Sequence, residues 1–597
     1  MDLWEKIAAS ILLMLLVWAL FRQTGDFEFL RLDDHDYTYR CAFVKDGLSL
    51  ANVREAFTNA RHGGIWMPVT YISYMCDISL FGPGPGAHHL VNVAIHALNA
   101  VLLLWLLVSL AAKNAKVAKI ILFLLAAFWA LHPQRAEAVA WIASRKELLC
   151  TAFVLGGLLC WRRSIIGTYA CYILACMSKP TAMCFPFLVL AVDWIRHSTS
   201  DARHPATGNN NFTLYALHFP LFICIAAAIG SLAIYSQTHP EGHAELALYS
   251  APLWWRLLNA AVAVGLYLFQ MVIPVGIHLD YRAVPGGWPV HGALGLGVLA
   301  VVVGAGAWWI CRRIRRRHGQ DLVADCHLLF FIGASCLWFF AALAPTLGIF
   351  GSFGEHARAD RFLYLPAMAV PIAAMLLYGA QAMPTGRKGI LPVAGLAIVV
   401  AGFSAVAYPV VASYRNDVTA FMRSAECDPG HGRALAHLGE ARCAAGDLDA
   451  GIELLRKSRE VRPRDATDAK LAYALMRRGR ADDWKEIREV CAAIVKDPAR
   501  DVRGQALEAL GTAELVARNW DEATRHLVLS VKAPARHYSS ADAILKLAYA
   551  HHNGGRRDEA QKLFEWVVSK SGREDLAVRA RQVLAIIEAS PQSILFW

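Results

Sequence analysis

The chain has 597 residues, of which 56% are hydrophobic and only 18% are charged. Its mean hydropathy of +0.37 is too high for an ordinary soluble protein and indicates a protein that crosses a membrane several times. The net charge of +11 does not indicate nucleic-acid binding, because much of the basic charge lies in short clusters beside hydrophobic segments.

Hydrophobic segments follow one another through the first 412 residues, which predicts a bundle of about eleven membrane spans. A helix needs about 20 apolar residues to cross a bilayer, and fewer where its ends are buried in protein. The first segment lacks a small-residue cleavage site after Leu20, so we expect a retained helix and not a signal peptide. The predicted spans are 7–21, 92–112, 117–131, 147–161, 164–178, 181–195, 213–236, 292–311, 326–346, 364–380 and 389–412.

Short basic clusters set the predicted orientation, because lysine and arginine accumulate on the cytoplasmic side of membrane spans. All of them fall on that side if the N-terminus is cytoplasmic and if 252–274 forms a re-entrant or interfacial helix that does not cross. With an odd number of spans, the tail after Ala412 then lies outside. The clusters are Lys113–Lys119, Arg162–Arg163, Arg312–Arg317 and Arg387–Lys388.

The tail differs in composition from the rest of the chain, which predicts two domains, 1–413 and 414–597. It repeats with a period near 35 residues, with a glycine at the turn, small residues where paired helices touch and a proline after the second helix. These are features of tetratricopeptide repeats. We predict an all-α chain whose tail has about four helical units and a closing helix near 574–589; it either binds a peptide or supports the membrane domain. The markers are Leu438–Gly439, Gly446–Asp447, Pro463, Pro498, Leu510–Gly511, Pro534 and Gly554–Gly555.

Acidic residues gather directly after the first predicted span, in the stretch Leu32-Asp33-Asp34-His35-Asp36. A carboxylate beside a membrane can act as a general base toward a hydroxyl group, or can hold a divalent metal. Asp33, Asp34 and Asp36 are all candidates, and the sequence does not rank them. The alternative is the solvated start of a loop.

A second polar stretch, 131–147, follows another span and predicts a short helix over 134–147 at the membrane surface. Glu137, Trp141 and Arg145 recur four residues apart, so they share one face of that helix. A carboxylate, an indole and a guanidinium on one face suit a site for sugar and phosphate. The alternative is an interfacial helix with an aromatic anchor and ordinary ion pairs.

Two further basic positions are candidates for binding the phosphate of a lipid-linked substrate. Lys179 lies between two apolar segments, where a charge costs roughly 2.5–3.5 kcal/mol unless it has a partner. Arg358 and Arg361 lie at the mouth of a span and can clamp a phosphate. The alternatives are snorkelling of the lysine to a lipid headgroup, and surface pairing of the arginines with Glu355 and Asp360.

A polar stripe of His89, Asn92, His96 and Asn99 recurs at helical spacing in one span. It either holds a metal or hydrogen-bonds to neighbouring helices. The chain has no Walker loop and no GxGxxG motif that opens a helix, so nucleotide chemistry is not expected. A sugar donor carried by a lipid would supply an external site.

Together, these stretches resemble the bacterial relatives of the transmembrane and tetratricopeptide-repeat O-mannosyltransferases, which have the GT-C glycosyltransferase fold. The combination carries the resemblance, which covers most of residues 30–370. The stretches are Leu32–Asp34, Trp66–Tyr71, Phe81–Asn92, His132–Lys146, Ser178–Pro180, Asp280–Tyr281 and Asp360–Pro366.

The resemblance implies an inverting, membrane-bound glycosyltransferase that moves a sugar from a polyprenyl phosphate to an acceptor hydroxyl. It places the reaction on the periplasmic side of a bacterial inner membrane, with a protein or glycan acceptor that the repeats present. Asp33 or Asp34 would be the base, and Glu137 would contact sugar or acceptor. Met67 and Leu32 depart from the histidine and tyrosine usual in the family, which leaves the sugar open. The implied substrate-binding residues are His35, His89, His132, Trp141, Arg145, Lys146, Lys179, Arg358, Arg361 and Tyr364.

Two other classes of protein compete with this interpretation. In a non-catalytic scaffold for envelope or polysaccharide assembly, the repeats would be functional and the spans an anchor, although eleven spans are more than an anchor needs. A flippase for lipid-linked sugars would carry charge along a path through the spans, whereas these charges gather on one side.

Overall fold

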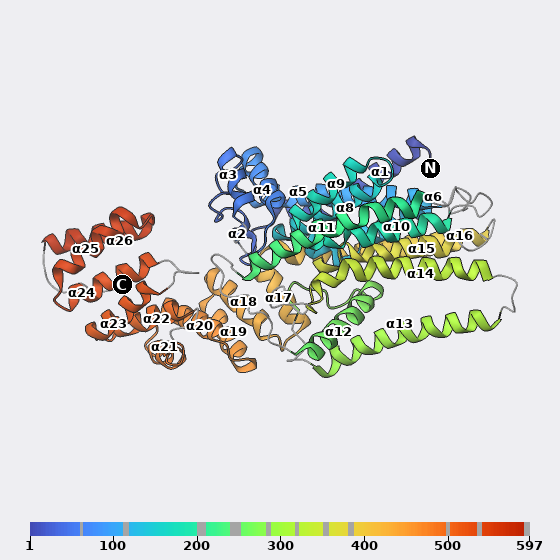
Figure 1. Cartoon of the computed structure of the whole chain (residues 1–597). Helices are drawn as coiled ribbons and strands as arrows, with labels where there is room; N and C mark the ends of the chain where they lie inside the picture. The colour runs from blue at the N-terminus through green and yellow to red at the C-terminus, as the bar shows by residue number, and fades with distance from the viewer. Residues whose placement is uncertain are drawn as a thin grey trace. The chain divides into compact units, whose positions relative to one another are not determined.

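The computed structural model describes an all-α chain with no strand in the described residues, which confirms the predicted class (Figure 1). It divides into two compact units, Met1–Cys427 and Asp428–Trp597. The first unit extends past the expected boundary at 413 because α17 (Asp417–Cys427) packs within it; for example, Arg423 Nε donates to the Ile277 carbonyl at 2.7 Å. The described residues are 1–59, 62, 64–111, 119–199, 210–238, 252–281, 288–316, 322–349, 358–379, 387–496, 502–533 and 540–589.

Among the described residues of the first unit, five helical segments are long and apolar enough to cross a membrane, by length and composition. Four of them coincide with predicted spans, but the predicted total of eleven is not confirmed. The fifth is α12 (Leu253–Val272), which lies in the segment predicted not to cross the membrane. The other four belong to α1 (Leu3–Phe21), α5 (Pro85–Leu110), α11 (Asn210–Thr238) and α16 (Arg387–Ala412).

The remaining predicted spans are also helices, several of them short. α6 (Lys119–Ala130) has 12 residues and is therefore only about 18 Å long, less than the roughly 30 Å of a hydrocarbon core. Five of these helices run side by side as a bundle (Figure 1). They are α8 (Arg145–Cys160), α9 (Ile165–Ser178), α10 (Phe185–Thr199), α14 (Leu322–Leu343) and α15 (Ala369–Gly379). The last, α13 (Trp288–Arg316), packs against α12.

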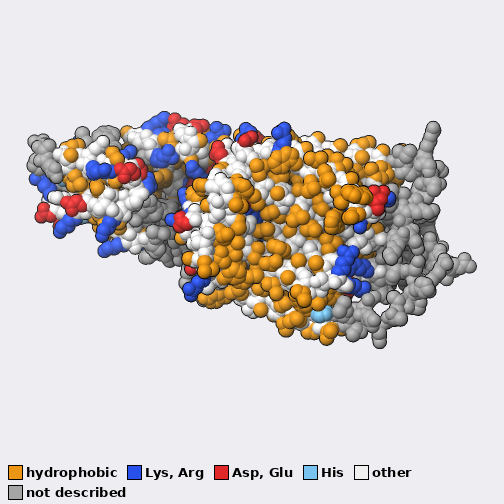
Figure 2. Space-filling model, turned by 90° about the horizontal axis from the view of Figure 1, so that it is seen from above, with side chains coloured by type: hydrophobic (Ala, Val, Ile, Leu, Met, Phe, Trp, Pro, Cys, Tyr) orange, Lys and Arg blue, Asp and Glu red, His pale blue; other side chains and the backbone are white. Residues whose placement is uncertain are grey.

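Hydrophobic side chains cover much of the face of the first unit that Figure 2 shows. Large apolar residues on α1 and α16 are exposed, among them Trp18, Leu391 and Ile398. Soluble proteins rarely expose contiguous apolar patches of more than a few hundred Å². Such a surface is expected where lipid, and not water, surrounds the helices.

The second unit is built from helices that pack in consecutive pairs, followed by a closing helix. This arrangement confirms the predicted four units. Gly446 joins the helices of the first pair with a positive φ of 95°, a conformation that glycine adopts without steric cost. The helices are α18 (Gly432–Ala444), α19 (Leu448–Val461), α20 (Asp465–Arg478), α21 (Asp483–Cys491), α22 (Arg503–Val516), α23 (Trp520–Lys532), α24 (Ser540–Asn553), α25 (Arg557–Lys570) and α26 (Glu574–Ala589).

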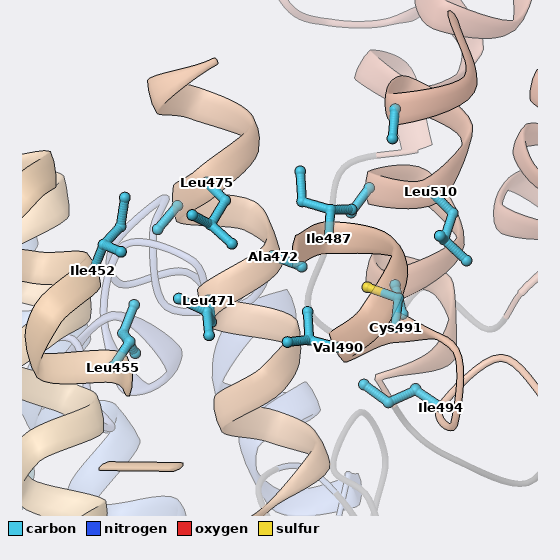
Figure 3. Close-up of a cluster of buried hydrophobic side chains, with 14 of the residues drawn as sticks. Ile452, Leu455, Leu471, Ala472, Leu475, Ile487, Val490, Cys491, Ile494 and Leu510 are labelled. Carbon is cyan, nitrogen blue, oxygen red and sulfur yellow. The ribbon is translucent and has the colours of Figure 1, made fainter. Parts of the chain in front are cut away.

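A continuous apolar core joins neighbouring pairs of this unit. Figure 3 shows Ile452 and Leu455 of α19 on one side of Leu471 and Leu475 of α20, and Ile487 of α21 on the other. All five side chains are fully buried. Each pair alone would expose one of these faces, so the pairs stabilise one another by stacking.

Gly439 is one of the small residues that let α18 and α19 approach closely. A Cβ atom at this position would lie 2.8 Å from the Gly451 carbonyl oxygen, so one helix must shift. We expect Gly439→Ala to lower the free energy of unfolding of the repeats by about 1–3 kcal/mol. Thermal unfolding of the full chain measures this, with the exposed Glu453→Ala as the control. An unchanged transition would contradict the close packing.

Candidate functional site

Asp34 joins the loop after α1 to a turn that lies more than a hundred residues away in the sequence. Its carboxylate is fully buried and accepts the backbone N–H groups of Leu30 and Ala143, both at 2.8 Å. Burial raises the pKa of Asp34 to about 8. Both oxygens of Asp34 are therefore occupied by backbone N–H groups. The neighbouring Asp33, at the N-cap of α2 (Asp34–Tyr37), is only partly buried.

The stretch 134–147 is not the single helix that its periodicity predicts. The chain turns at Trp141, whose φ and ψ of −94° and 119° are extended. Asn92 donates to the carbonyl oxygens of Val139 and Trp141, and Asp34 accepts from Ala143, so tertiary hydrogen bonds replace helical ones. The stretch contains η2 (Pro133–Arg135), α7 (Ala136–Ala140), η3 (Ile142–Ser144) and the start of α8.

Glu137 and Trp141 meet Arg361, although no continuous helix aligns them. The buried Glu137 carboxylate accepts the backbone N–H of Arg361 at 2.9 Å and pairs with its guanidinium. The guanidinium lies 4.8 Å from the ring centroids of both Trp141 and Phe362. Burial raises the pKa of Glu137 to about 7, against the opposing charge of Arg361.

Two lysines complete a group of three interacting cations with Arg361. Lys179 follows the end of α9, pairs with Glu147 and lies 5.2 Å from the Phe362 ring centroid. Lys146 lies 3.3 Å from the Tyr37 hydroxyl, and its charge interacts with Asp33, Lys179 and Arg361.

The structure therefore brings together six predicted site residues from four separate segments. We call this group the cation cluster and define it as Asp33, Glu137, Trp141, Lys146, Lys179 and Arg361. Three cations whose charges interact can bind an anion such as a phosphate, and a carboxylate beside them can accept a proton.

Arg145 does not belong to the cation cluster. Its guanidinium is fully buried, contacts Asp77 at 2.5 Å, and donates to Asn92 at 2.8 Å and to the His88 carbonyl at 2.7 Å. Asp77 also bonds His88 Nδ1 at 2.7 Å. These contacts tie α8 to α5 and to α4 (Pro68–Phe81).

We expect Arg145→Met to destabilise the first unit by about 3–5 kcal/mol, because Asp77 would keep a buried charge without its arginine. The melting temperature of the protein in lipid nanodiscs measures this. Arg40→Met, at an exposed position, is the control and should leave the melting temperature unchanged. Equal melting of all three proteins would contradict a structural role.

Arg358 and Arg361 point to different partners and do not form a joint clamp. Arg358 donates to Gln270 of α12 at 2.7 Å and lies 3.9 Å from the Tyr281 ring centroid. Tyr281 in turn donates to Asp360 at 2.6 Å. Glu355, the other expected partner, lies outside the described residues.

The predicted histidines and Tyr364 lie in packed surroundings outside the cation cluster. Tyr364 contacts His96 at 2.6 Å, and His89 contacts the Glu28 carbonyl at 3.3 Å. His132 Nε2 lies 3.2 Å from the Met271 carbonyl. His35 is buried next to Asp36, in the same loop as Asp33.

The polar side chains of the stripe on α5 form hydrogen bonds to neighbouring segments, which is one of the two predicted roles. Asn99 donates to the Leu148 carbonyl at 2.9 Å, and His96 Nε2 lies 2.9 Å from the Ala130 carbonyl. Within the described part of the chain, no group of three or more His, Cys, Asp or Glu side chains is placed to hold a metal ion.

Sequence analysis missed three residues of the site: Tyr37, Glu147 and Phe362. Tyr37 and Glu147 each pair with a predicted cation, and Phe362 lies between two. Glu147 had a signal, since it follows Lys146 in the same polar stretch. The other two lie in stretches that were singled out for their charges alone.

No protein-family model matches the chain. Over 100 residues, or 17% of the chain, it is 32% identical to protein O-mannosyl-transferase TMTC1 of Mus musculus, so it spans a tenth of that relative's length. This stretch supports, in part, the resemblance that the motifs indicated. Among solved structures, yeast Tom70 matches 79% of this chain with 94% of its own, at 13% identity and a TM-score of 0.19, which is too low to support an argument.

Proposed function

We propose that the protein is an integral membrane glycosyltransferase of the GT-C type, which moves a sugar from a polyprenyl-phosphate donor to an acceptor hydroxyl, such as that of a protein serine or threonine. The observation that carries the proposal is the cation cluster, which combines three cations, two acids and an indole in loops and at helix ends. The partial similarity to an O-mannosyl-transferase supports it.

The charges suggest a division of roles. Lys146, Lys179 and Arg361 would bind the donor phosphate and stabilise the charge that develops as it leaves. Asp33 would be the catalytic base, because it is partly open and interacts with the charge of Lys146. Asp34 would be a positioning residue, because its two oxygens hold backbone N–H groups.

In the reaction, Asp33 takes the proton of the acceptor hydroxyl. The hydroxyl oxygen forms a bond to the anomeric carbon while the bond from that carbon to the phosphate oxygen breaks. The electron pair leaves with the lipid phosphate, and a single displacement inverts the sugar. Glu137 would keep Arg361 in place through its bonds to the backbone and the guanidinium of that residue.

The basic clusters of the sequence favour a cytoplasmic N-terminus, provided that α12 does not cross the membrane. A location in a bacterial inner membrane follows from the resemblance to the bacterial relatives of the O-mannosyltransferases. The site and the repeats would then face the periplasm. The repeats would present the acceptor to the membrane unit, because helical solenoids commonly use their extended surfaces to bind other molecules.

A transfer assay on purified protein in nanodiscs tests the proposal, with a panel of polyprenyl-phosphate sugars and serine/threonine-rich acceptor peptides. We expect sugar to leave one donor of the panel. Donor binding that is unchanged after removal of both Lys179 and Arg361 would contradict the proposal.

The second candidate is a membrane-anchored repeat scaffold without catalysis. The observation in its favour is the extensive core of the repeat unit, which suits a platform for partner proteins. A scaffold should bind its partners equally well after Asp33→Asn, whereas the enzyme should lose transfer.

A further inference from the structure

A small polar cavity borders the ion pair of Lys179 and Glu147. It has a volume of about 20 Å³, room for roughly one water molecule. Besides this pair, three threonines face it from separate elements: Thr151 of α8, Thr181 of η4 (Pro180–Cys184) and Thr346 of η6 (Ala344–Thr346). A lysine and threonine hydroxyl groups can donate to a phosphate; the Thr346 hydroxyl donates to the Leu343 carbonyl at 2.8 Å and would have to turn from it to bind a ligand.

Lys179 is held at a break in the chain, between the end of α9 and Pro180. Both members of its ion pair are 7% exposed, so the two charges neutralise each other away from bulk water. A phosphate cannot enter a cavity of this size while the Glu147 carboxylate remains on Lys179, and the two anions would also repel each other.

Glu137 and Glu147 differ in how they are held. Glu137 is bound to both the backbone and the side chain of Arg361, so its position is fixed from two sides. The contact of Glu147 with Lys179 joins two flexible side chains. Of the two acids, Glu147 can leave its cation with less disturbance of the backbone.

We infer that Glu147 occupies, in the empty site, the position of the substrate phosphate: a lipid phosphate displaces it and binds to Lys179 and the threonine hydroxyls, and its return releases the product. This inference rests on the proposed function. The leaving lipid phosphate is a monoester, with a charge of about −1.5 to −2 at pH 7, whereas the donor is a diester with a single charge. The product would therefore bind more strongly, and a competing carboxylate would favour its release.

The test measures binding of a long-chain polyprenyl phosphate to the full-length protein in nanodiscs. We expect Glu147→Gln to bind it about ten-fold more tightly, because a charge-assisted bond of roughly 1.5–3 kcal/mol no longer has to be broken. Multiple-turnover kcat and KM should both fall, because release of the product becomes slower. Glu5→Gln, which removes an acid from the exposed pair with Lys119, is the matched control and should change nothing.

A second variant separates the failure of this inference from that of the proposed function. If Lys179→Met weakens binding at least ten-fold and Glu147→Gln strengthens it, the inference stands. If Lys179→Met weakens binding but Glu147→Gln does not strengthen it, the inference is wrong and the phosphate site remains. If Lys179→Met leaves binding unchanged, the role of Lys179 in the proposed function is wrong too. Glu147→Asp, which has a shorter side chain, should bind the polyprenyl phosphate with an affinity between those of the wild type and Glu147→Gln. It serves as a check that the position tolerates substitution.

Discussion

Asp33→Asn is expected to lower sugar transfer by about 10²- to 10⁴-fold and to leave the melting temperature unchanged. The expected loss is that of a general base, and the partly exposed Asp33 side chain is not part of the buried network. Transfer under single-turnover conditions and thermal unfolding in nanodiscs measure the two effects on the same samples.

Asp34→Asn is the matched comparison, one residue along the chain. An amide offers one acceptor oxygen, so either the Leu30 or the Ala143 N–H group would face an NH₂ group. We expect a loss of about 1–3 kcal/mol in stability together with reduced transfer. If Asp33→Asn destabilised the protein and Asp34→Asn did not, the two roles would have to be exchanged.

The burial of Asp34 also predicts how stability changes with pH. Burial raises its pKa to about 8 in the folded protein, against about 4 in the unfolded chain. Between these values the unfolded state releases a proton that the folded state keeps, so this group lowers the free energy of unfolding as the pH rises from 4 to 8. This decrease in the free energy of unfolding between pH 4 and 8 should be absent in the Asp34→Asn variant.

Removing either member of the pair between Glu137 and Arg361 is expected to reduce transfer at least 10²-fold. Each single variant, Glu137→Gln or Arg361→Met, leaves one buried group without its partner, which costs about 3–5 kcal/mol for a buried pair. Both variants also remove the side-chain bond between the guanidinium and Glu137, while the Arg361 backbone N–H keeps an acceptor oxygen at position 137 in each.

The double variant distinguishes a structural role from a substrate-binding one. With both partners removed, no unpaired charge stays buried, so much of the lost stability should return. Transfer should stay low, because the phosphate has still lost Arg361. Recovery of both properties would show that Arg361 only holds the loop.

This pair also predicts an acidic limb in the pH profile of transfer. Because the pKa of Glu137 is raised to about 7, its carboxylate pairs fully with Arg361 above that pH and becomes protonated below it. Transfer should therefore fall as the pH drops through 7, and Glu137→Gln should remove this dependence.

Local patterns in the sequence predicted the helices and the repeats well, because glycine, proline and small residues act through their immediate neighbours. The break at Trp141 could not be predicted in this way, because hydrogen bonds from Asn92 and to Asp34 cause it, and these residues lie about 50 and 110 positions away. The prediction that Arg145 belongs to the site was wrong for a similar reason. Its partner Asp77 lies on another helix, so the sequence around Arg145 does not show that its charge is already paired.

The number of membrane spans could not be predicted for a different reason. The eleven predicted spans were counted from hydrophobicity, but α6 is too short to cross alone, and the burial of α12 among its neighbours has no local signal. The pairing of Glu147 with Lys179 could likewise not be predicted locally, because the two residues lie 32 positions apart.

The first turn of α8 carries three consecutive charges with three different destinations. Arg145 contacts Asp77, Lys146 contacts Tyr37, and Glu147 contacts Lys179. Successive residues of a helix point about 100° apart, so this separation depends on the rotation of the helix about its own axis. Deleting or inserting one residue in this turn would move every charge to a neighbour's destination, so this short segment should tolerate substitutions far better than changes of length.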